Sequence, residues 1–163
     1  RELVVLRKKE FENYRTMPAP DSRFQTTGLV YQGHSFKNTA KAETSLEGDT
    51  RKGLGCCPGV VRGKVRVVTD PRGARLEPGE ILVAERTDPG WIMLFPAASG
   101  LLVERGSLLS HSAIVSREMG IPAIVSLAGV TVWLKTGDWV EFDGSTGVVK
   151  KLVSEKELEI SHV

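Results

Sequence analysis

The sequence predicts an α/β fold that contains a short parallel β-α-β unit and a closing hairpin. Short apolar, β-branched runs recur between residues 55 and 152, and turn residues separate them, which is typical of strands. One clear helical segment, residues 112–119, lies between two of these runs. Asp143 and Gly144 form an Asp-Gly pair, a common signal for a tight hairpin turn. These observations indicate one compact domain in this part of the chain.

The overall composition is that of a globular protein with a modest core. Of the 163 residues, 40% are hydrophobic and 26% are charged. The 22 basic and 20 acidic residues leave a formal net charge of +2. This balance gives no strong electrostatic reason to bind nucleic acid or an anionic membrane surface. We therefore expect neither of them as a partner.

The sequence indicates neither a membrane span nor an oxidising compartment. Its longest apolar stretch, residues 91–103, is interrupted by proline, serine and glycine and is shorter than the roughly 20 residues that span a bilayer. Cys56 and Cys57 are adjacent, which makes neither a spaced metal motif nor a disulfide framework. His34 and His162 have no neighbouring ligands, so we expect no metal site. A cytoplasmic location is the simplest expectation.

Four segments are expected along the chain. Residues 1–20 begin with a charged helix that stops before a Met-Pro-Ala-Pro run, and we expect them to end a preceding domain or to form a linker. Residues 21–54 are polar with little periodicity, which predicts a loosely ordered connector or a loosely packed hairpin. Residues 55–152 form the compact domain, and residues 153–163 form a tail. Because the chain does not begin with methionine, we expect a piece of a longer protein.

Strands are expected where β-branched and apolar residues cluster within the compact domain. These runs are residues 60–61, 65–68, 81–84, 101–103, 123–125 and 148–149. Residues 91–96 are expected to form one or two helical turns. Residues 101–125 have the size of a compact β-α-β unit, whose two strands pair in parallel and are joined by the predicted helix.

The ends of this helix are predicted from single residues. Residues 113–115 supply its apolar face, Ser110 is the expected N-cap, and Gly120 before Pro122 is the expected stop. His111 then lies at the start of the helix. In a β-α-β unit, this is the carboxyl edge of the strands, where ligand chemistry collects.

The start of a helix gives His111 an environment that favours a negatively charged group. Free backbone N–H groups and the positive end of the helix dipole both attract anions. Neutral imidazole is a competent nucleophile near pH 7, so it can take a phosphoryl group from a donor and give it to an acceptor. A lone histidine at a helix end is more often bonded to the backbone. The surrounding sequence decides between these two roles.

The sequence around His111 resembles a family signature. The phosphohistidine signature of the phosphoenolpyruvate-utilising enzymes resembles residues 106–125, Gly-Ser-Leu-Leu-Ser-His-Ser-Ala-Ile-Val-Ser-Arg-Glu-Met-Gly-Ile-Pro-Ala-Ile-Val. This family contains pyruvate phosphate dikinase, phosphoenolpyruvate synthase, the sugar-phosphotransferase enzyme I and rifampicin phosphotransferase. The similarity extends to its opening strand pair in residues 55–68, to its next strand and Thr-x-Pro loop in residues 81–91, and to its closing hairpin in residues 137–148.

The resemblance implies a swivelling β/β/α domain, the phosphohistidine domain of a larger phosphotransferase. Such a domain relays a phosphoryl group between an ATP site and a phosphoenolpyruvate, pyruvate or other acceptor site on other domains of the same parent protein. It also implies that the parent enzyme is similar to pyruvate water dikinase and uses ATP and Mg²⁺, whereas this domain binds no cofactor itself. The isolated chain is then a carrier and not a complete catalyst.

The resemblance also implies roles for single residues. His111 corresponds to the phosphorylated nucleophile, and the family precedent favours its Nε2 atom. The residues expected to support the phosphate are Gly106, Ser107, Ser110, Ser112, Arg117 and Glu104. Ser110 either caps the helix only or also contacts the phosphate. Arg117 is either solvated or ion-paired or contacts the phosphate, and Glu104 either orients the imidazole or faces solvent.

Two positions differ from the commonest form of the signature. Leu109 stands where dikinases have threonine and is similar to the Leu-Ser-His version of the rifampicin phosphotransferase and synthase-like branch. Leucine has no hydroxyl that could be a regulatory phosphosite. Ser107 replaces the second glycine, and its Cβ restricts positive φ. The alternative function is therefore a catalytically silent swivelling module that acts as an interaction or spacer domain.

Overall fold

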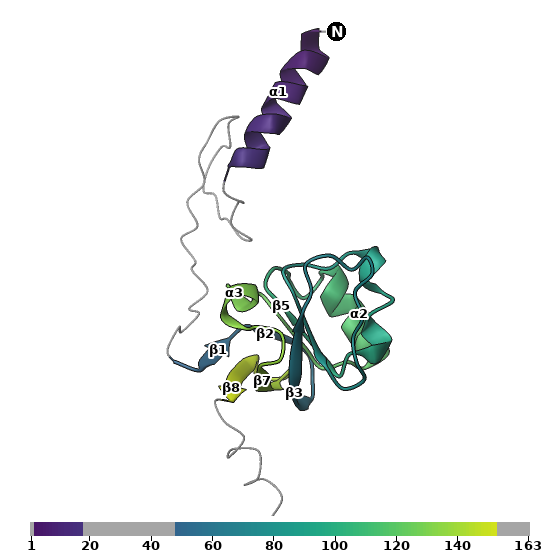
Figure 1. Ribbon diagram of the computed structural model, residues 1–163, viewed down its shortest axis with the longest axis vertical. Helices are drawn as coiled ribbons and strands as arrows, with labels where there is room; N and C mark the ends of the chain where they lie inside the picture. The colour runs from purple at the N-terminus through teal and green to yellow at the C-terminus, as the bar shows by residue number, and fades with distance from the viewer. Residues whose placement is uncertain (1, 18–47, 153–163) are drawn as a thin grey trace, which may run out of the picture. The chain divides into compact units, whose positions relative to one another are not determined.

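The computed structural model describes residues 2–17 and 48–152 (Figure 1). These residues belong to two units, and the first of them contains the helix α1 (Glu2–Thr16). A helix is therefore present where the sequence predicts one before the two prolines. The expectations for residues 21–47 and for the tail, residues 153–163, lie outside the described residues.

The second unit is an α/β domain built on an 8-stranded sheet with the order β1-β8-β7-β3-β4-β5-β6-β2. Its strands are β1 (Thr50–Lys52), β2 (Leu54–Cys57), β3 (Val60–Val67), β4 (Ile81–Ala84), β5 (Gly100–Val103), β6 (Ala123–Val125), β7 (Trp139–Asp143) and β8 (Val148–Leu152). Its helical elements are η1 (Pro89–Trp91), η2 (Phe95–Ala97), α2 (His111–Met119) and α3 (Val130–Trp133).

The predicted parallel β-α-β unit is confirmed. β5 and β6 pair in parallel, with Leu101 opposite Ala123 and Leu102 opposite Ile124, and α2 connects them. β3, β4 and β5 also pair in parallel, so their carboxyl ends face the same edge of the sheet as the end of β6. The loops that follow β4, β5 and β6 therefore meet at one edge.

β1 and β2 follow each other in the chain but lie at opposite ends of the sheet. β1 pairs with β8, whereas β2, which begins just after Gly53, pairs with β6. The chain itself, and not a further pair of hydrogen-bonded strands, thus joins the two ends of the sheet. The two strands expected from the resemblance of residues 55–68 are present as β2 and β3, and they pair with other strands and not with each other.

The strand β1 lies in the segment where the sequence predicts a connector. Its residues, Thr50, Arg51 and Lys52, are polar and show no alternation of apolar side chains. Their backbone groups pair with β8, with Thr50 opposite Lys150. Long-range pairing, which local sequence does not encode, therefore extends the domain to residues before position 55.

Two apolar clusters lie on the two faces of the central strands. On β4, Ile81 and Val83 point into one cluster, and Leu82 and Ala84 point into the other, as the two-residue period of a strand requires. The first cluster also contains Val130 of α3, whereas the second contains Ala113 of α2. Figure 1 shows α2 and α3 on opposite sides of the sheet.

The closing hairpin is also confirmed, because β7 and β8 pair in antiparallel register. Asp143 organises its turn: its carboxylate accepts hydrogen bonds from the Ser145 amide at 2.8 Å and from the Thr146 hydroxyl at 2.9 Å. These bonds, led by the Ser145 amide, hold the pKa of Asp143 below its ordinary value. The residue with positive φ is Gly147, at 77°, and not Gly144 of the Asp-Gly pair.

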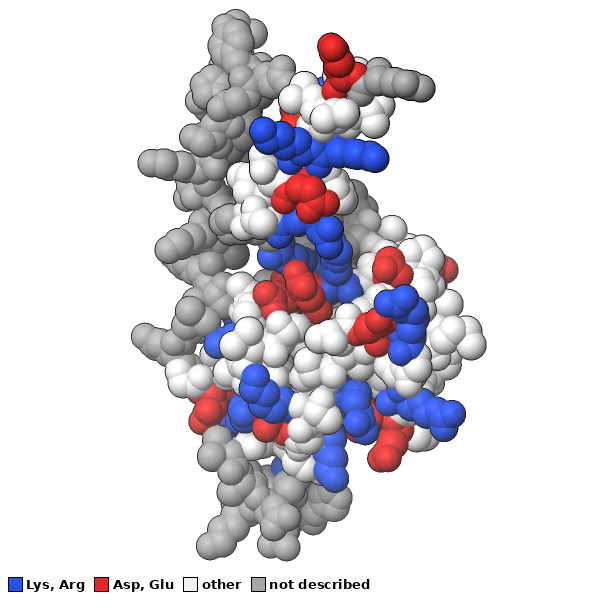
Figure 2. All heavy atoms as spheres, turned by 45° about the horizontal axis from the view of Figure 1, so that its top comes forward, with Lys and Arg blue, Asp and Glu red and all other residues white. Residues whose placement is uncertain are grey.

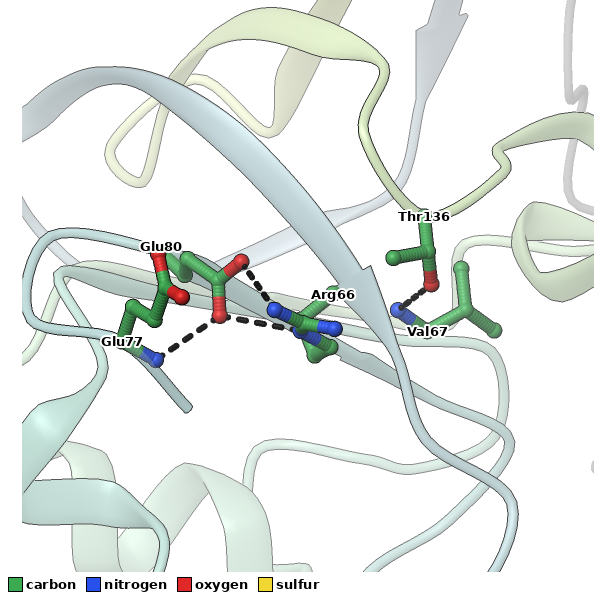
Figure 3. Close-up of polar contacts among 5 residues, drawn as sticks. All are labelled: Arg66, Val67, Glu77, Glu80 and Thr136. Atoms are coloured by element: carbon green, nitrogen blue, oxygen red, sulfur yellow. Dashed lines mark hydrogen bonds and ion pairs between the residues drawn. The ribbon is translucent and has the colours of Figure 1, made fainter. Parts of the chain in front are cut away.

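A nearly buried ion pair joins β3 to the residue before β4 (Figure 3). The Arg66 guanidinium donates to both oxygens of Glu80, at 3.0 Å and 2.8 Å, and the Glu77 amide donates to the same carboxylate at 2.9 Å. Beside it, the Val67 amide donates to the Thr136 hydroxyl at 3.0 Å. Burial raises the pKa of Glu80, but the three donors outweigh burial and leave that pKa below its ordinary value.

We expect Glu80→Gln to lower the free energy of unfolding by about 1–2 kcal/mol at pH 7, because it removes charge-assisted hydrogen bonds. A carboxylate with a depressed pKa stabilises the fold above its unfolded pKa of about 4.3, and this stabilisation is lost as the pH falls through the folded pKa. The difference between the two proteins should therefore shrink from pH 7 to about pH 3. Urea unfolding at both pH values measures it.

Glu77→Gln is the matched control, because the exposed Glu77 side chain makes none of these hydrogen bonds and acts on Arg66 only through its charge. Its unfolding free energy should stay within about 0.5 kcal/mol of the parent at pH 7. A Glu80→Gln effect that is the same at both pH values would contradict the electrostatic explanation.

Candidate functional site

The candidate site lies at the carboxyl edge of β4, β5 and β6, where three loops are tied together. The Arg105 amide in the loop after β5 donates to the Glu85 carbonyl after β4 at 2.8 Å. The Ser126 hydroxyl after β6 donates to the Gly106 carbonyl. The loop after β5, which leads to His111, is thus hydrogen-bonded to the loop after β4 and to the loop after β6.

The helix α2 begins at His111 and leaves its first amides free. Ser110 is extended, with ψ at 158°, and the first helical hydrogen bond runs from the Ile114 amide to the Ser110 carbonyl at 3.0 Å. No described residue accepts a hydrogen bond from the amides of His111, Ser112 or Ala113. These N–H groups, at the positive end of the helix dipole, are the kind of donors that bind phosphate oxygens.

Ser110 is at the N-cap position, but its side chain does not cap the helix, so the expectation of a capping hydroxyl is wrong. The hydroxyl donates to the Ser107 carbonyl at 2.7 Å and lies 3.0 Å from the Ser112 hydroxyl. Ser112 is 2% exposed, so its hydroxyl faces this internal bond. Because neither hydroxyl occupies the helix amides, these amides remain available to a ligand.

The imidazole of His111 is held on two sides and is half-buried. Its Nδ1 lies 3.1 Å from the Thr87 hydroxyl, in the loop after β4. The ring of buried Phe95 lies 6.1 Å from it, centroid to centroid, with the planes tilted by 37°. This orientation leaves Nε2 without a hydrogen bond to the described residues.

Thr87 is the partner of His111 that sequence reasoning missed as a site residue. The Thr-x-Pro loop is part of the resemblance, but it gave Thr87 no role. A hydroxyl can accept from Nδ1–H, which leaves the lone pair of the neutral ring on Nε2, and it can also donate to a bare Nδ1. One side chain thus fits both neutral tautomers of the ring.

Arg117 is exposed, as one of its two expected roles requires, whereas Glu104 takes neither of its two expected positions. The Arg117 guanidinium is exposed and donates to the Leu108 carbonyl at 2.8 Å, which brings a positive charge to the signature loop. Glu104 is half-buried and accepts hydrogen bonds from the amide and hydroxyl of Thr131, at the start of α3. The structure therefore does not bring Glu104 to the imidazole, which Thr87 orients instead.

Gly106 and Ser107, in the loop between β5 and α2, both fit the geometry of that loop. Among the described residues other than glycine, Ser126 alone has a positive φ, at 55°. Ser107 therefore adopts no left-handed conformation, and its Cβ adds no backbone strain. Gly106 is needed for close packing, because a Cβ there would lie 2.9 Å from the Ser110 hydroxyl oxygen.

The described residues support thiol chemistry and metal binding less well than they support chemistry at His111. Burial raises the pKa of Cys56, whose thiol donates to the Ala123 carbonyl at 3.3 Å, so this thiol stays protonated. Within residues 2–17 and 48–152, no group of three or more His, Cys, Asp or Glu side chains could hold a metal ion. Over the same residues, no helix is long and apolar enough to cross a membrane. Figure 2 shows acidic and basic side chains interspersed on the face that it draws.

Comparison with known proteins shows which family this chain resembles. The family model described as "PEP-utilising enzyme, mobile domain" matches residues 76–147. An uncharacterized protein of Mycobacterium tuberculosis is 42% identical over 120 residues, which are 74% of this chain and 14% of that protein. Rifampicin phosphotransferase of Bacillus cereus is 39% identical over 150 residues, which are 92% of this chain and 16% of that protein.

A third relative is the probable phosphoenolpyruvate synthase of Staphylothermus marinus, 41% identical over 107 residues, which are 64% of this chain and 13% of that protein. Among solved structures, one of Enzyme I is 34% identical and has a TM-score of 0.45, over 52% of this chain and 35% of that chain. The chain spans about one seventh of the length of the curated relatives that it matches. The family model thus recognises the mobile domain of the PEP-utilising enzymes in residues 76–147 of this chain.

Proposed function

We propose that this chain is the phosphohistidine carrier of a larger cytoplasmic phosphotransferase, in which His111 relays a phosphoryl group between two other domains. The observation that carries the proposal is the position of His111: Thr87 holds Nδ1, Nε2 is unpartnered among the described residues, and free amides of α2 lie beside it. The match to the family model supports it, because the mobile domain carries the phosphohistidine in these phosphotransferases.

The proposed transfer consists of two displacements at phosphorus. The lone pair of His111 Nε2 attacks the phosphorus of a donor, and the bond from phosphorus to the leaving oxygen breaks, with its electron pair going to that oxygen. The amides of Ser112 and Ala113 stabilise the negative charge on the phosphoryl oxygens. An acceptor oxygen or nitrogen then attacks the same phosphorus, and the electron pair of the P–N bond returns to Nε2.

The donor and the acceptor sites belong to other parts of the parent protein. We propose ATP with Mg²⁺ as the donor and pyruvate, as in a pyruvate water dikinase-like reaction, or another small molecule as the acceptor. The relatives support a phosphotransferase, since their names are rifampicin phosphotransferase and probable phosphoenolpyruvate synthase. The described residues of this chain need only bind the phosphoryl group.

The test is to incubate the purified chain with phosphoramidate, a small phosphoryl donor that modifies reactive neutral histidines. We expect one phosphate that is stable at alkaline pH and lost in acid, which is the behaviour of phosphohistidine. Peptide mass spectrometry at alkaline pH should place it on His111. A chain that takes up no phosphate, or takes it up elsewhere, would support the alternative of a catalytically silent module.

Thr87→Val should slow phosphate uptake from phosphoramidate about tenfold, because a lost hydrogen bond of about 1.4 kcal/mol no longer holds the Nδ1–H tautomer. The nitrogen chemical shifts of His111 should move toward the mixed tautomers of free histidine. Thr87→Ser keeps the hydroxyl and should retain most of the rate. If Thr87→Val reacts as fast as the parent protein, Thr87 has no role in orienting the ring.

A further inference from the structure

Ser126, the residue after β6, has a backbone conformation that serine rarely adopts. Its φ is 55°, in the left-handed region, and every other described residue with a positive φ is a glycine. A residue with a Cβ is strained in this region, whereas glycine is not. Such strain persists only where the surrounding structure holds it, and it is concentrated at functional sites. The serine side chain at this position therefore needs a physical reason.

The path of the backbone explains the conformation of Ser126 but not the choice of serine. Val125 is the last residue of β6 and pairs with Leu54 of β2. Two residues later, the Leu127 amide donates to the Val103 carbonyl, at the end of β5, at 3.1 Å. The left-handed residue between them lets the chain leave β6 and still bond to the end of β5. Glycine would make the same turn without strain.

The hydroxyl is the group that serine adds at this turn. It donates to the Gly106 carbonyl, in the loop that leads from β5 to His111, and both residues are half-buried. The two loops are also in close contact, because a Cβ on Gly106 would lie 3.3 Å from the Cβ of Val125. The Ser126 hydroxyl thus holds the loop after β5 against the end of β6.

Gly106 is in turn packed against the residue before His111. A Cβ on Gly106 would lie 2.9 Å from the Ser110 hydroxyl oxygen, and the Ser110 carbonyl accepts the first hydrogen bond of α2. A shift of Gly106 would therefore move the start of α2, and with it the imidazole and the free amides. Because Thr87 holds Nδ1 from a different loop, the same shift would change the contact between Nδ1 and the Thr87 hydroxyl.

We infer that Ser126 is a positioning residue for His111. Its hydroxyl fixes the loop before α2, so that the imidazole and the helix amides meet the incoming phosphoryl group in one arrangement. The left-handed strain is retained because glycine, which would remove it, has no hydroxyl. The inference rests on the proposed function and adds a residue that acts on the reaction without touching phosphate.

The experiment compares Ser126→Ala with Ser126→Gly, because both remove the hydroxyl but only the glycine removes the strain. We expect phosphate uptake from phosphoramidate to slow about fivefold in both variants, since one hydrogen bond no longer holds the loop. The nitrogen chemical shifts of His111 should move in both, because the contact between Nδ1 and Thr87 changes. Ser126→Gly should nevertheless melt about 4 °C higher than Ser126→Ala, because it is free of the left-handed strain.

Ser99→Ala is the matched control. The Ser99 hydroxyl also donates to a glycine carbonyl, that of Gly79, at 2.8 Å, but it lies just before β5, at the opposite edge of the sheet. This variant should melt at a lower temperature than the parent protein, because it loses a comparable hydrogen bond. Its rate of phosphate uptake and its His111 chemical shifts should remain unchanged.

Four results would each overturn the inference. They are uptake at the parent rate in either Ser126 variant, faster uptake in Ser126→Gly than in Ser126→Ala, equal melting temperatures of these two variants, and a fivefold loss of uptake in Ser99→Ala. Failure of the parent chain to take up phosphate from phosphoramidate would instead overturn the proposed function.

Discussion

His111→Asn should abolish phosphate uptake by the chain, from phosphoramidate and from a protein donor alike. The asparagine side chain is similar in size to the part of the histidine side chain that lies nearest the backbone. Its amide nitrogen, however, has no free lone pair to attack phosphorus. The loss should be at least about 1,000-fold, because nothing else in the proposed mechanism forms the P–N bond. The measurement is phosphate incorporation by mass spectrometry of the intact protein at alkaline pH.

The variant should still fold, which separates chemistry from stability. The imidazole makes one side-chain hydrogen bond, to Thr87, and its loss should lower the free energy of unfolding by about 1 kcal/mol. Incorporation that persists in His111→Asn at the parent rate, on His34 or His162, would refute the carrier assignment.

Gly144→Ala should destabilise the domain by about 3 kcal/mol or more. An added Cβ would lie 2.0 Å from the Cys57 carbonyl oxygen and 3.1 Å from the Ala123 amide nitrogen. Both neighbours are backbone atoms of paired strands, so neither can move without breaking the sheet. The Gly144 amide itself donates to the Gly59 carbonyl at 2.8 Å, which holds the two segments together. Urea unfolding measures the loss.

Gly120→Ala is the control that separates the effect of a steric clash from the effect of backbone strain. Gly120 ends α2 with φ at 67°, but nothing lies within 4 Å of where its Cβ would be. Its substitution should therefore cost only the left-handed strain of about 1 kcal/mol. Comparable losses for the two variants would show that steric contact at Gly144 is not the dominant cause.

The sequence predicts those parts of the fold that depend on residues close to one another in the chain. The unit β5-α2-β6 is predicted because apolar runs, a turn glycine and a compact spacing all lie within residues 101–125. The strand β1 and the short helix α3 were not predicted. Both depend on distant partners: β1 on β8, and α3 on the cluster that contains β4 residues.

The candidate site likewise contains residues that neighbouring sequence predicts and residues that only the pairing of distant strands brings together. His111 and its place at a helix start follow from neighbouring residues, whereas the partner Thr87 is 24 positions away. It reaches the imidazole because β4 and β5 are parallel neighbours, which brings the loops after them to one edge. Glu104 is closer in sequence, but its direction at the end of β5 takes it to Thr131. Which side chains converge was thus set by strand order.

The shortness of the strands at the two ends of the sheet has a consequence for the behaviour of the domain in solution. A sheet with bare outer strands offers unsatisfied amides and carbonyls to any passing chain, and such edges seed aggregation. Here the outer strands are β1 and β2, which are three and four residues long and are each paired on one side. Because such short edges expose few unpaired groups, the risk of self-association through strands is small.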